Sequence, residues 1–226
     1  MEEILRVAGL EGYPAEPVRI HDETVVVVRP GAEGQRLLGP VRAALPEHNT
    51  VLALHREVLD PDSFHDRSPG ELIAWVRTAD VDAELARLPG FSYALLDEES
   101  LGTGDEGYDL DSYDVARFGE PELLVILPRP EPWAAFAYLN PYGVWGVPGD
   151  LLLAAARRWH ERYGAAPTTI GLANGFTVAR RPTGMAEAER LAVEHEAIAG
   201  LTARTTTRAY ARALLDLDRW CLYNRP

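Results

Sequence analysis

Apolar residues in the first half of the chain alternate between short continuous runs and helical spacing. The run 25–28 consists of valines and is closed by Pro30, which is typical of a buried strand at 24–29. The next strand is expected at 50–55. Between the two strands, apolar residues at helical spacing predict a helix that Pro40 splits or kinks; they are Leu37, Leu38, Val41, Ala44 and Leu45. The predicted order is therefore strand, helix, strand.

Two helix starts follow in the sequence. Ser68-Pro69-Gly70-Glu71 is a capping box, in which serine and glutamate side chains bond to each other's backbone N–H groups. Proline at the first helical position is also favourable. A helix is predicted to begin at this point. A second, short helix is predicted to begin after Asp80 and to end at Pro89-Gly90.

The second half of the chain begins with a predicted strand at 123–127, ended by Pro128, and a short helix at 133–139. Asp150 is expected to cap a longer helix, and Gly164 is expected to end it. The apolar stripe of this helix consists of Leu152, Ala155, Trp159 and Tyr163.

An Asn-Gly pair lies in the middle of the next segment. Two β-prone runs, 168–172 and 176–180, flank Asn174-Gly175, which is the favoured pair for a two-residue type I′ turn. They predict an antiparallel hairpin over 168–180. Two helices and a closing strand complete the pattern, at 183/184–200, 205–215 and 220–223. The whole pattern predicts an α+β fold with mixed sheets flanked by helices.

The composition changes between residues 97 and 122. This stretch holds ten acidic residues against one arginine, and three glycines lie at 102, 104 and 107. Such a segment is typical of an exposed loop or junction. We therefore predict an N-terminal α/β segment at 1–96, an acidic loop or junction at 97–117 and a C-terminal domain at 118–226.

The charged residues exclude several chemistries. The chain has 22 basic and 35 acidic residues, a net charge of −13, and every basic residue is an arginine. Without lysine, no Schiff base can hold pyridoxal phosphate, and no P-loop or kinase lysine can bind a nucleotide phosphate. An acidic surface repels phosphates, so no nucleic-acid partner is expected. Arginine in place of lysine indicates a GC-rich, bacterial genome.

The cytoplasm is the expected location. The start of the chain has no basic region followed by an apolar run, so a signal peptide is not expected. The longest apolar runs, 25–28 and 151–156, are shorter than the roughly 20 residues that cross a bilayer. Cys221 is the single cysteine, which excludes an internal disulfide and a multi-cysteine metal site.

Three motifs have more ordinary explanations. Residues 102–107 match G-x-G-x-x-G, but acidic flanks favour a flexible loop over a dinucleotide site. Asp109, Asp111 and Glu120 have the spacing of a calcium loop that lacks its central glycine. Four residues in one loop could bind a metal or be solvated turn residues: Asp60, Asp62, His65 and Asp66. No cofactor or metal is predicted.

The candidate catalytic residues are His160, Glu194 and His195. His195 lies on the apolar stripe of its helix and is preceded by Glu194, so it could be a general base oriented by a carboxylate. The favoured alternative is a core histidine bonded to a backbone carbonyl. His160, beside Trp159, has the same two interpretations. Cys221 is interpreted as a buried apolar residue.

Aromatic residues concentrate between 133 and 145. Trp133 and Phe136 are expected in the core, whereas Asn140, Tyr142 and Trp145 are predicted to line a cleft for a ligand or a partner. The alternative is that the rings fill the space between helices and sheet. His160 or His195 should lie near the cleft if it carries out chemistry.

Several spaced motifs resemble one family. They occur in order at 124–128, 133–140, 158–165, 178–182, 188–195 and 210–211. Over about residues 122–226 the chain resembles the uncharacterised bacterial domain-of-unknown-function 4253 family. The resemblance implies a domain and no activity. Polar and cysteine positions of the family are replaced here at 145–147 and 200–202, so a site formed by them in other members would be lost.

Two functional hypotheses remain open. The first is a cytosolic bacterial binding or interaction protein with an acidic face and an aromatic-lined cleft, whose partner is a basic protein, as in an immunity-like protein, or a small molecule. The second is a hydrolase-type enzyme using His160 or His195 with Glu194. The oligomeric state cannot be derived from the sequence.

Overall fold

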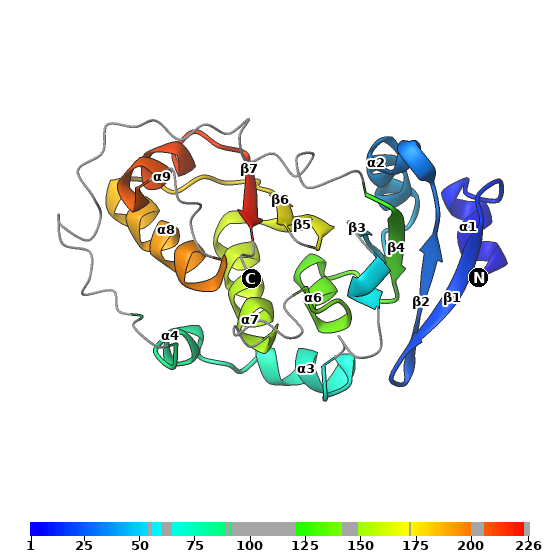
Figure 1. Ribbon diagram of the computed structural model, residues 1–226, viewed down its shortest axis with the longest axis horizontal. Coiled ribbons are helices and arrows are strands. Elements are labelled where there is room, and N and C mark those ends of the chain that lie inside the picture. The colour runs from blue at the N-terminus through cyan, green and yellow to red at the C-terminus, as the bar shows by residue number, and fades with distance from the viewer. Residues whose placement is uncertain are drawn as a thin grey trace.

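One seven-stranded mixed sheet forms the centre of the protein (Figure 1). The computed structural model describes residues 1–53, 56–59, 65–88, 91, 121–141, 149–171, 173–199 and 206–223. Within them the strand order is β1-β2-β4-β3-β5-β6-β7. The strands are β1 Ala15–Ile20, β2 Glu23–Val28, β3 Asn49–Ala53, β4 Leu123–Leu127, β5 Ala166–Ile170, β6 Ala173–Thr177 and β7 Arg219–Tyr223.

A strand from the second half of the sequence, β4, lies between two strands from the first half, β2 and β3. β4 pairs antiparallel with both β2 and β3, and β3 pairs parallel with β5. The remaining neighbours are antiparallel. The predicted α+β fold with mixed strands is confirmed. Because β4 lies between two earlier strands, the N-terminal and C-terminal halves share one sheet.

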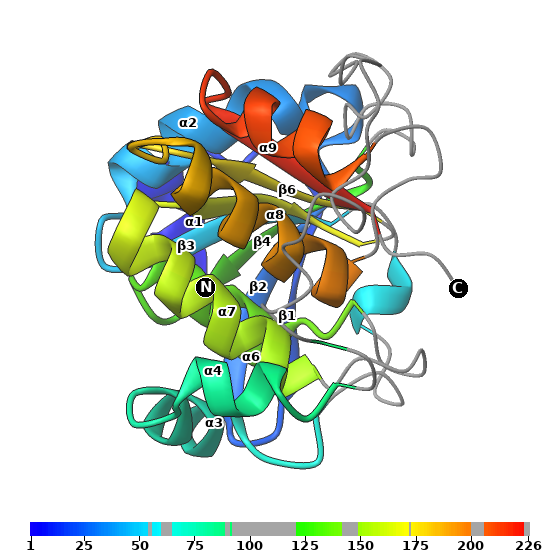
Figure 2. The same ribbon diagram turned by 90° about the vertical axis from the view of Figure 1, so that its left-hand side faces the viewer.

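Helices cover both faces of the sheet (Figures 1 and 2). They are α1 Glu2–Ala8, α2 Gly34–Ala44, α3 Pro69–Val76, α4 Val81–Leu85, α6 Ala135–Tyr138, α7 Gly149–Tyr163, α8 Met185–Ala199 and α9 Thr207–Leu214. Short 3-10 turns are η1 Gly31–Glu33, η2 Arg56–Leu59 and η7 Pro132–Ala134. Val26 and Val28 pack with α1 and α2, whereas Val25 and Val27 belong to the larger core with α3, α4 and α6 to α9. Successive side chains of β2 thus point to opposite faces of the sheet and contribute to two separate cores.

Local sequence signals explain the helix starts. Ser68 Oγ accepts from the Glu71 backbone N–H, and Glu71 accepts from the Ser68 backbone N–H, so the predicted capping box of α3 is present. Asp80 accepts from two backbone N–H groups at the start of α4. Gly164 follows α7 with φ of 63°, a left-handed conformation that favours glycine.

The turn of the predicted hairpin was placed incorrectly. β5 and β6 do form an antiparallel hairpin, but the chain reverses before Asn174, and Asn174-Gly175 lies inside β6. There these two residues pair with Leu222 and Cys221 of β7. Pairing with a third strand therefore overrides the local turn preference. The buried Asn174 amide oxygen accepts from the Gly171 backbone N–H at 3.3 Å, so it supports the turn from the strand.

Three smaller expectations also differ from the structure. Asp150 lies within the first turn of α7, because this helix already includes Gly149. Pro40 does not split its helix, because it lies inside α2, which runs without a break from 34 to 44. The hydrophobic pattern predicted neither α1 nor β1, since both are amphipathic edge elements with few buried residues. The acidic segment 97–117 lies outside the described residues. Among the helices that are described, none is long and apolar enough to span a bilayer.

Candidate functional site

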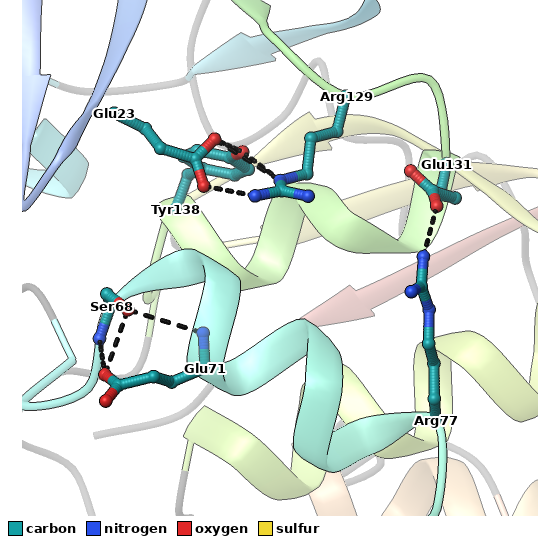
Figure 3. A network of polar contacts seen from close by, with 7 residues as sticks. All are labelled: Glu23, Ser68, Glu71, Arg77, Arg129, Glu131 and Tyr138. Atoms are coloured by element: carbon teal, nitrogen blue, oxygen red, sulfur yellow. Dashed lines mark hydrogen bonds and ion pairs between the residues drawn. The ribbon is translucent and has the colours of Figure 1, made fainter.

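Three side chains form a polar network at one end of the sheet, the rim network (Figure 3). Glu23 begins β2, Arg129 follows β4, and Tyr138 ends α6. The Tyr138 hydroxyl donates to Glu23 Oε2 at 2.6 Å, and Arg129 Nη2 lies 2.5 Å from Glu23 Oε1. Arg129 Nε also donates to the Tyr138 hydroxyl at 3.0 Å. One carboxylate thus connects two strands and a helix.

The rim network keeps its ordinary protonation states near neutral pH. Burial raises the pKa of Glu23, but hydrogen bonds from Arg129 and Tyr138 outweigh this effect and leave the pKa below its ordinary value. Burial and the Glu23 carboxylate raise the pKa of Tyr138. The hydrogen bond to Glu23 raises the pKa of Arg129. Glu23 and Arg129 remain charged and Tyr138 remains protonated, so none of the three is suited to proton transfer near pH 7.

A second set of residues, the His65 corner, lies where the 65–71 segment meets α6 and α7. It consists of His21, His65, Asn140 and Gly149. His21 Nε2 donates to the His65 carbonyl at 2.7 Å, and His65 Nε2 donates to the Phe136 carbonyl at 2.8 Å. His21 has φ of 53°, a conformation that is costly for a residue other than glycine and that marks the tight β1–β2 turn. The two imidazoles therefore fasten a turn, a loop and a helix together.

Gly149 permits the close packing of this corner. A methyl group there would lie 2.6 Å from both Asn140 Oδ1 and His65 Cε1. Burial lowers the pKa of His65, although its hydrogen bond to the Phe136 carbonyl and the nearby Asp150 carboxylate oppose this. Asp150 itself pairs with Arg67 at 3.0 Å. His65 is thus a neutral, structurally engaged histidine at neutral pH.

The predicted cleft residues can be followed only in part. Asn140 is half-buried within the His65 corner, whereas Tyr142 and Trp145 lie outside the described residues. Trp133 and Phe136 are buried in the larger core, as expected. The predicted cleft therefore stays a prediction. What the structure adds is that Asn140 lies beside His65.

Glu194 belongs to a buried ion-pair network, the core network. Its Oε1 lies 3.0 Å from Arg158 Nη2, and its Oε2 accepts from Trp159 Nε1 at 2.9 Å. Arg158 Nη1 also pairs with Asp82 at 2.7 Å. Exposed fractions of 3% for the Glu194 side chain and 9% for Arg158 show that water is largely excluded from the pair. The network connects α4, α7 and α8.

His195 lies in an aromatic cluster next to the core network, the ring cluster. Its members are Trp159, Phe176, His195, Tyr210 and Trp220. The imidazole centroid lies 4.6 Å from the Trp159 ring and 4.8 Å from the Trp220 ring. His195 Nδ1 is 2.8 Å from the Tyr210 hydroxyl, and its side chain has no exposed surface. Burial lowers the pKa of His195 to about 3, so it is neutral at physiological pH.

The polar partner of His195 differs from the expected one. A backbone carbonyl was predicted, but the partner is the Tyr210 hydroxyl. His160 does contact a carbonyl: its Nδ1 is 3.0 Å from the Ala165 oxygen just beyond α7. Cys221 was expected to be buried, but on the edge strand β7 it is only half-buried. Glu194 and His195 lie beside Arg158 and Trp159. His160 instead contacts the backbone just beyond the C-terminal end of α7.

The comparisons with known proteins concern the second half of the chain. Residues 123–223 match the family described as Domain of unknown function (DUF4253). Over these residues the chain is similar to that family. This confirms the resemblance inferred from the spaced motifs. No curated protein and no solved structure matches the chain.

The DUF4253 match divides the networks described above. The match includes the Arg158–Glu194 pair of the core network and the whole ring cluster. By contrast, Glu23, His21 and His65 precede it, so the rim network and the His65 corner each combine residues of the matched segment with earlier ones. Sequence analysis missed Glu23 and Arg129 because they lie about a hundred residues apart and carry no local motif.

Metal binding has no support among the described residues. Within that part of the chain, no group of three or more histidine, cysteine, aspartate or glutamate side chains could hold a metal ion. Of the loop considered as a metal site, His65 and Asp66 belong to the described residues, and the His65 imidazole donates to the Phe136 carbonyl. Asp60 and Asp62 fall outside the described residues.

Proposed function

We propose that this protein binds a basic partner protein in the bacterial cytoplasm, as an immunity-like protein does. The observation that carries the proposal is the structural use of every candidate catalytic side chain. Glu194 neutralises Arg158 and accepts from Trp159, and His195 is enclosed by rings without contact to solvent. A hydrolase needs its base to reach a substrate. Binding is therefore better supported than hydrolysis.

The charge distribution supports a basic partner. Residues 97–122 carry ten acidic residues and one arginine, a large share of the net charge of −13. Carboxylates concentrated in one stretch attract cationic surfaces and increase the association rate with them. The described surface is more balanced, because arginines pair with carboxylates at several points, as Arg77 does with Glu131 (Figure 3) and Arg29 does with Glu16.

The proposal is tested by removing charge at two places. One variant replaces Asp105, Glu106, Asp109 and Asp111 by the corresponding amides. The matched control replaces four exposed carboxylates elsewhere, those of Glu2, Glu3, Glu11 and Glu47. Binding to a deca-arginine peptide, measured by fluorescence anisotropy at 50 and 150 mM NaCl, should weaken at least tenfold in the first variant. In the control it should change less than threefold.

Equal losses in both variants would contradict the proposal, because binding would then reflect net charge alone. Affinity unchanged in both would contradict it as well. If only the variant of residues 105–111 loses affinity, the same variant serves as the negative control in a pull-down of the natural partner. A protein that the wild type retains and this variant releases is then the specific candidate.

A further inference from the structure

The α8–α9 pair is held to the rest of the molecule around one buried imidazole. His195 projects from α8 into the ring cluster and contacts Trp159 of α7, Tyr210 of α9 and Trp220 of β7. α8 and α9 themselves lie side by side at one end of the molecule (Figures 1 and 2). His195 is therefore the residue where these two helices meet both α7 and the last strand.

The hydrogen bonding of His195 leaves no place for a second proton. Nδ1 has the Tyr210 hydroxyl as its partner, and the buried Nε2 has no hydrogen-bond partner within the described part of the chain. A neutral imidazole requires one donor and one acceptor, whereas an imidazolium has two N–H donors. Tyr210 can accept one of them. The second N–H, and the positive charge, would be buried against indole rings.

Neighbouring charges do not compensate for protonation. Among the described residues, four charged or titratable groups face the ring cluster: Arg158 and Tyr163 on α7, Glu194 on α8 and Tyr210 on α9. β6 and β7 contribute the rings of Phe176 and Trp220. Glu194 is already paired with Arg158 and bonded to Trp159. Burial is the cause that lowers the pKa of His195. The imidazole gains its proton readily only once water reaches it.

We propose that the α8–α9 pair is an acid-released cover on α7 and β7, with His195 as its trigger. At neutral pH the uncharged imidazole keeps the ring cluster closed. As the pH falls below the ordinary pKa of histidine, proton binding to the open state favours opening of α8 and α9 before the rest of the sheet unfolds. Opening exposes Trp159 and Trp220, which gives the chain a second surface at acidic pH.

The experiment measures hydrogen exchange of the full chain at pH 7, 6, 5 and 4, with intrinsic rates corrected. Linkage to one proton predicts that the opening constant of α8 and α9 rises by up to about tenfold per pH unit below about pH 6. Amides of α2, on the other face of the sheet, should open with a smaller slope. His195→Phe, which cannot titrate, should remove the slope in α8 and α9. His160→Gln should leave it unchanged.

Three results would overturn the proposal. The first is an opening constant of α8 and α9 that does not depend on pH. The second is a parallel rise in α2, which would mean global acid unfolding. The third is an unchanged slope in His195→Phe. If His195→Phe fails to fold, His195→Gln takes its place, and the regional comparison within the wild-type protein decides the question by itself.

Discussion

The core network and the rim network use the same chemistry in different surroundings. Each contains a glutamate, an arginine and an aromatic donor: Glu194, Arg158 and Trp159 in the first, and Glu23, Arg129 and Tyr138 in the second. The core network also includes Asp82, through Arg158. The core pair has side-chain exposed fractions of 3% and 9%, compared with 17% and 34% in the rim pair. Distance and partner type are similar, so burial is what distinguishes them.

Burial changes what each network does. A buried ion pair contributes little net stability, but it strongly disfavours losing one partner, because the other charge is left without water. A pair near the surface is partly hydrated, and either charge can be removed at a lower cost. The core network thus constrains how α4, α7 and α8 pack. The rim network is the one that a ligand or partner could reach.

The largest expected effect is the loss of Arg158. Arg158→Met leaves the Glu194 carboxylate buried next to Trp159, and the free energy of unfolding should fall by about 3–5 kcal/mol. Chemical denaturation monitored by tryptophan fluorescence measures it. Arg212→Met removes an exposed arginine from α9 as the matched control, with an expected change within about 0.5 kcal/mol. If both variants lowered the free energy of unfolding equally, burial of the arginine would not explain the loss in Arg158→Met.

A smaller effect is expected at the His65 corner. The methyl group of Gly149→Ala would overlap His65 and Asn140, so the hydrogen bond from His65 to Phe136 must shift. Thermal and urea unfolding should show a loss of about 1–3 kcal/mol. Gly12→Ala is the control, because Gly12 is exposed and a methyl group there meets no atom within 4 Å. The free energy of unfolding of this variant should change by less than about 0.5 kcal/mol. An equally small change in Gly149→Ala would show that the corner is loosely packed.

The smallest effect is expected in the rim network, and its size should depend on pH. Glu23→Gln should lower the free energy of unfolding by about 1–2 kcal/mol at pH 7. Since the folded pKa of Glu23 is lowered, its contribution is present above the ordinary value of 4.5 and is lost as the pH falls through the lower, folded pKa. Urea unfolding at pH 7, 5 and 3 should show the difference shrinking at pH 3. A difference that grows with acidity would reverse the assigned direction.

Local signals in the sequence predicted most elements and part of the candidate site. The capping box at Ser68, the valine run in β2 and the apolar stripe of α7 act within a few residues, so their outcome does not depend on distant partners. The inward direction of His195 followed from the same periodicity, and Trp133 and Phe136 are buried as expected. The similarity of the second half to the DUF4253 family was also recognisable from its spaced motifs.

Tertiary structure decided everything that depends on residues far apart in the sequence. β4 lies between β2 and β3, Glu23 meets Arg129 and Tyr138, and Asn174-Gly175 pairs with β7 instead of forming a turn. None of these contacts has a local signature in the sequence. Each forms only when the sheet and its helices pack together through many weak apolar contacts. The sequence by itself determined many of the buried apolar positions, such as those of β2 and of the α7 stripe. The packing of the sheet and helices determined which buried groups meet, and so which carboxylate is paired and which imidazole is kept neutral.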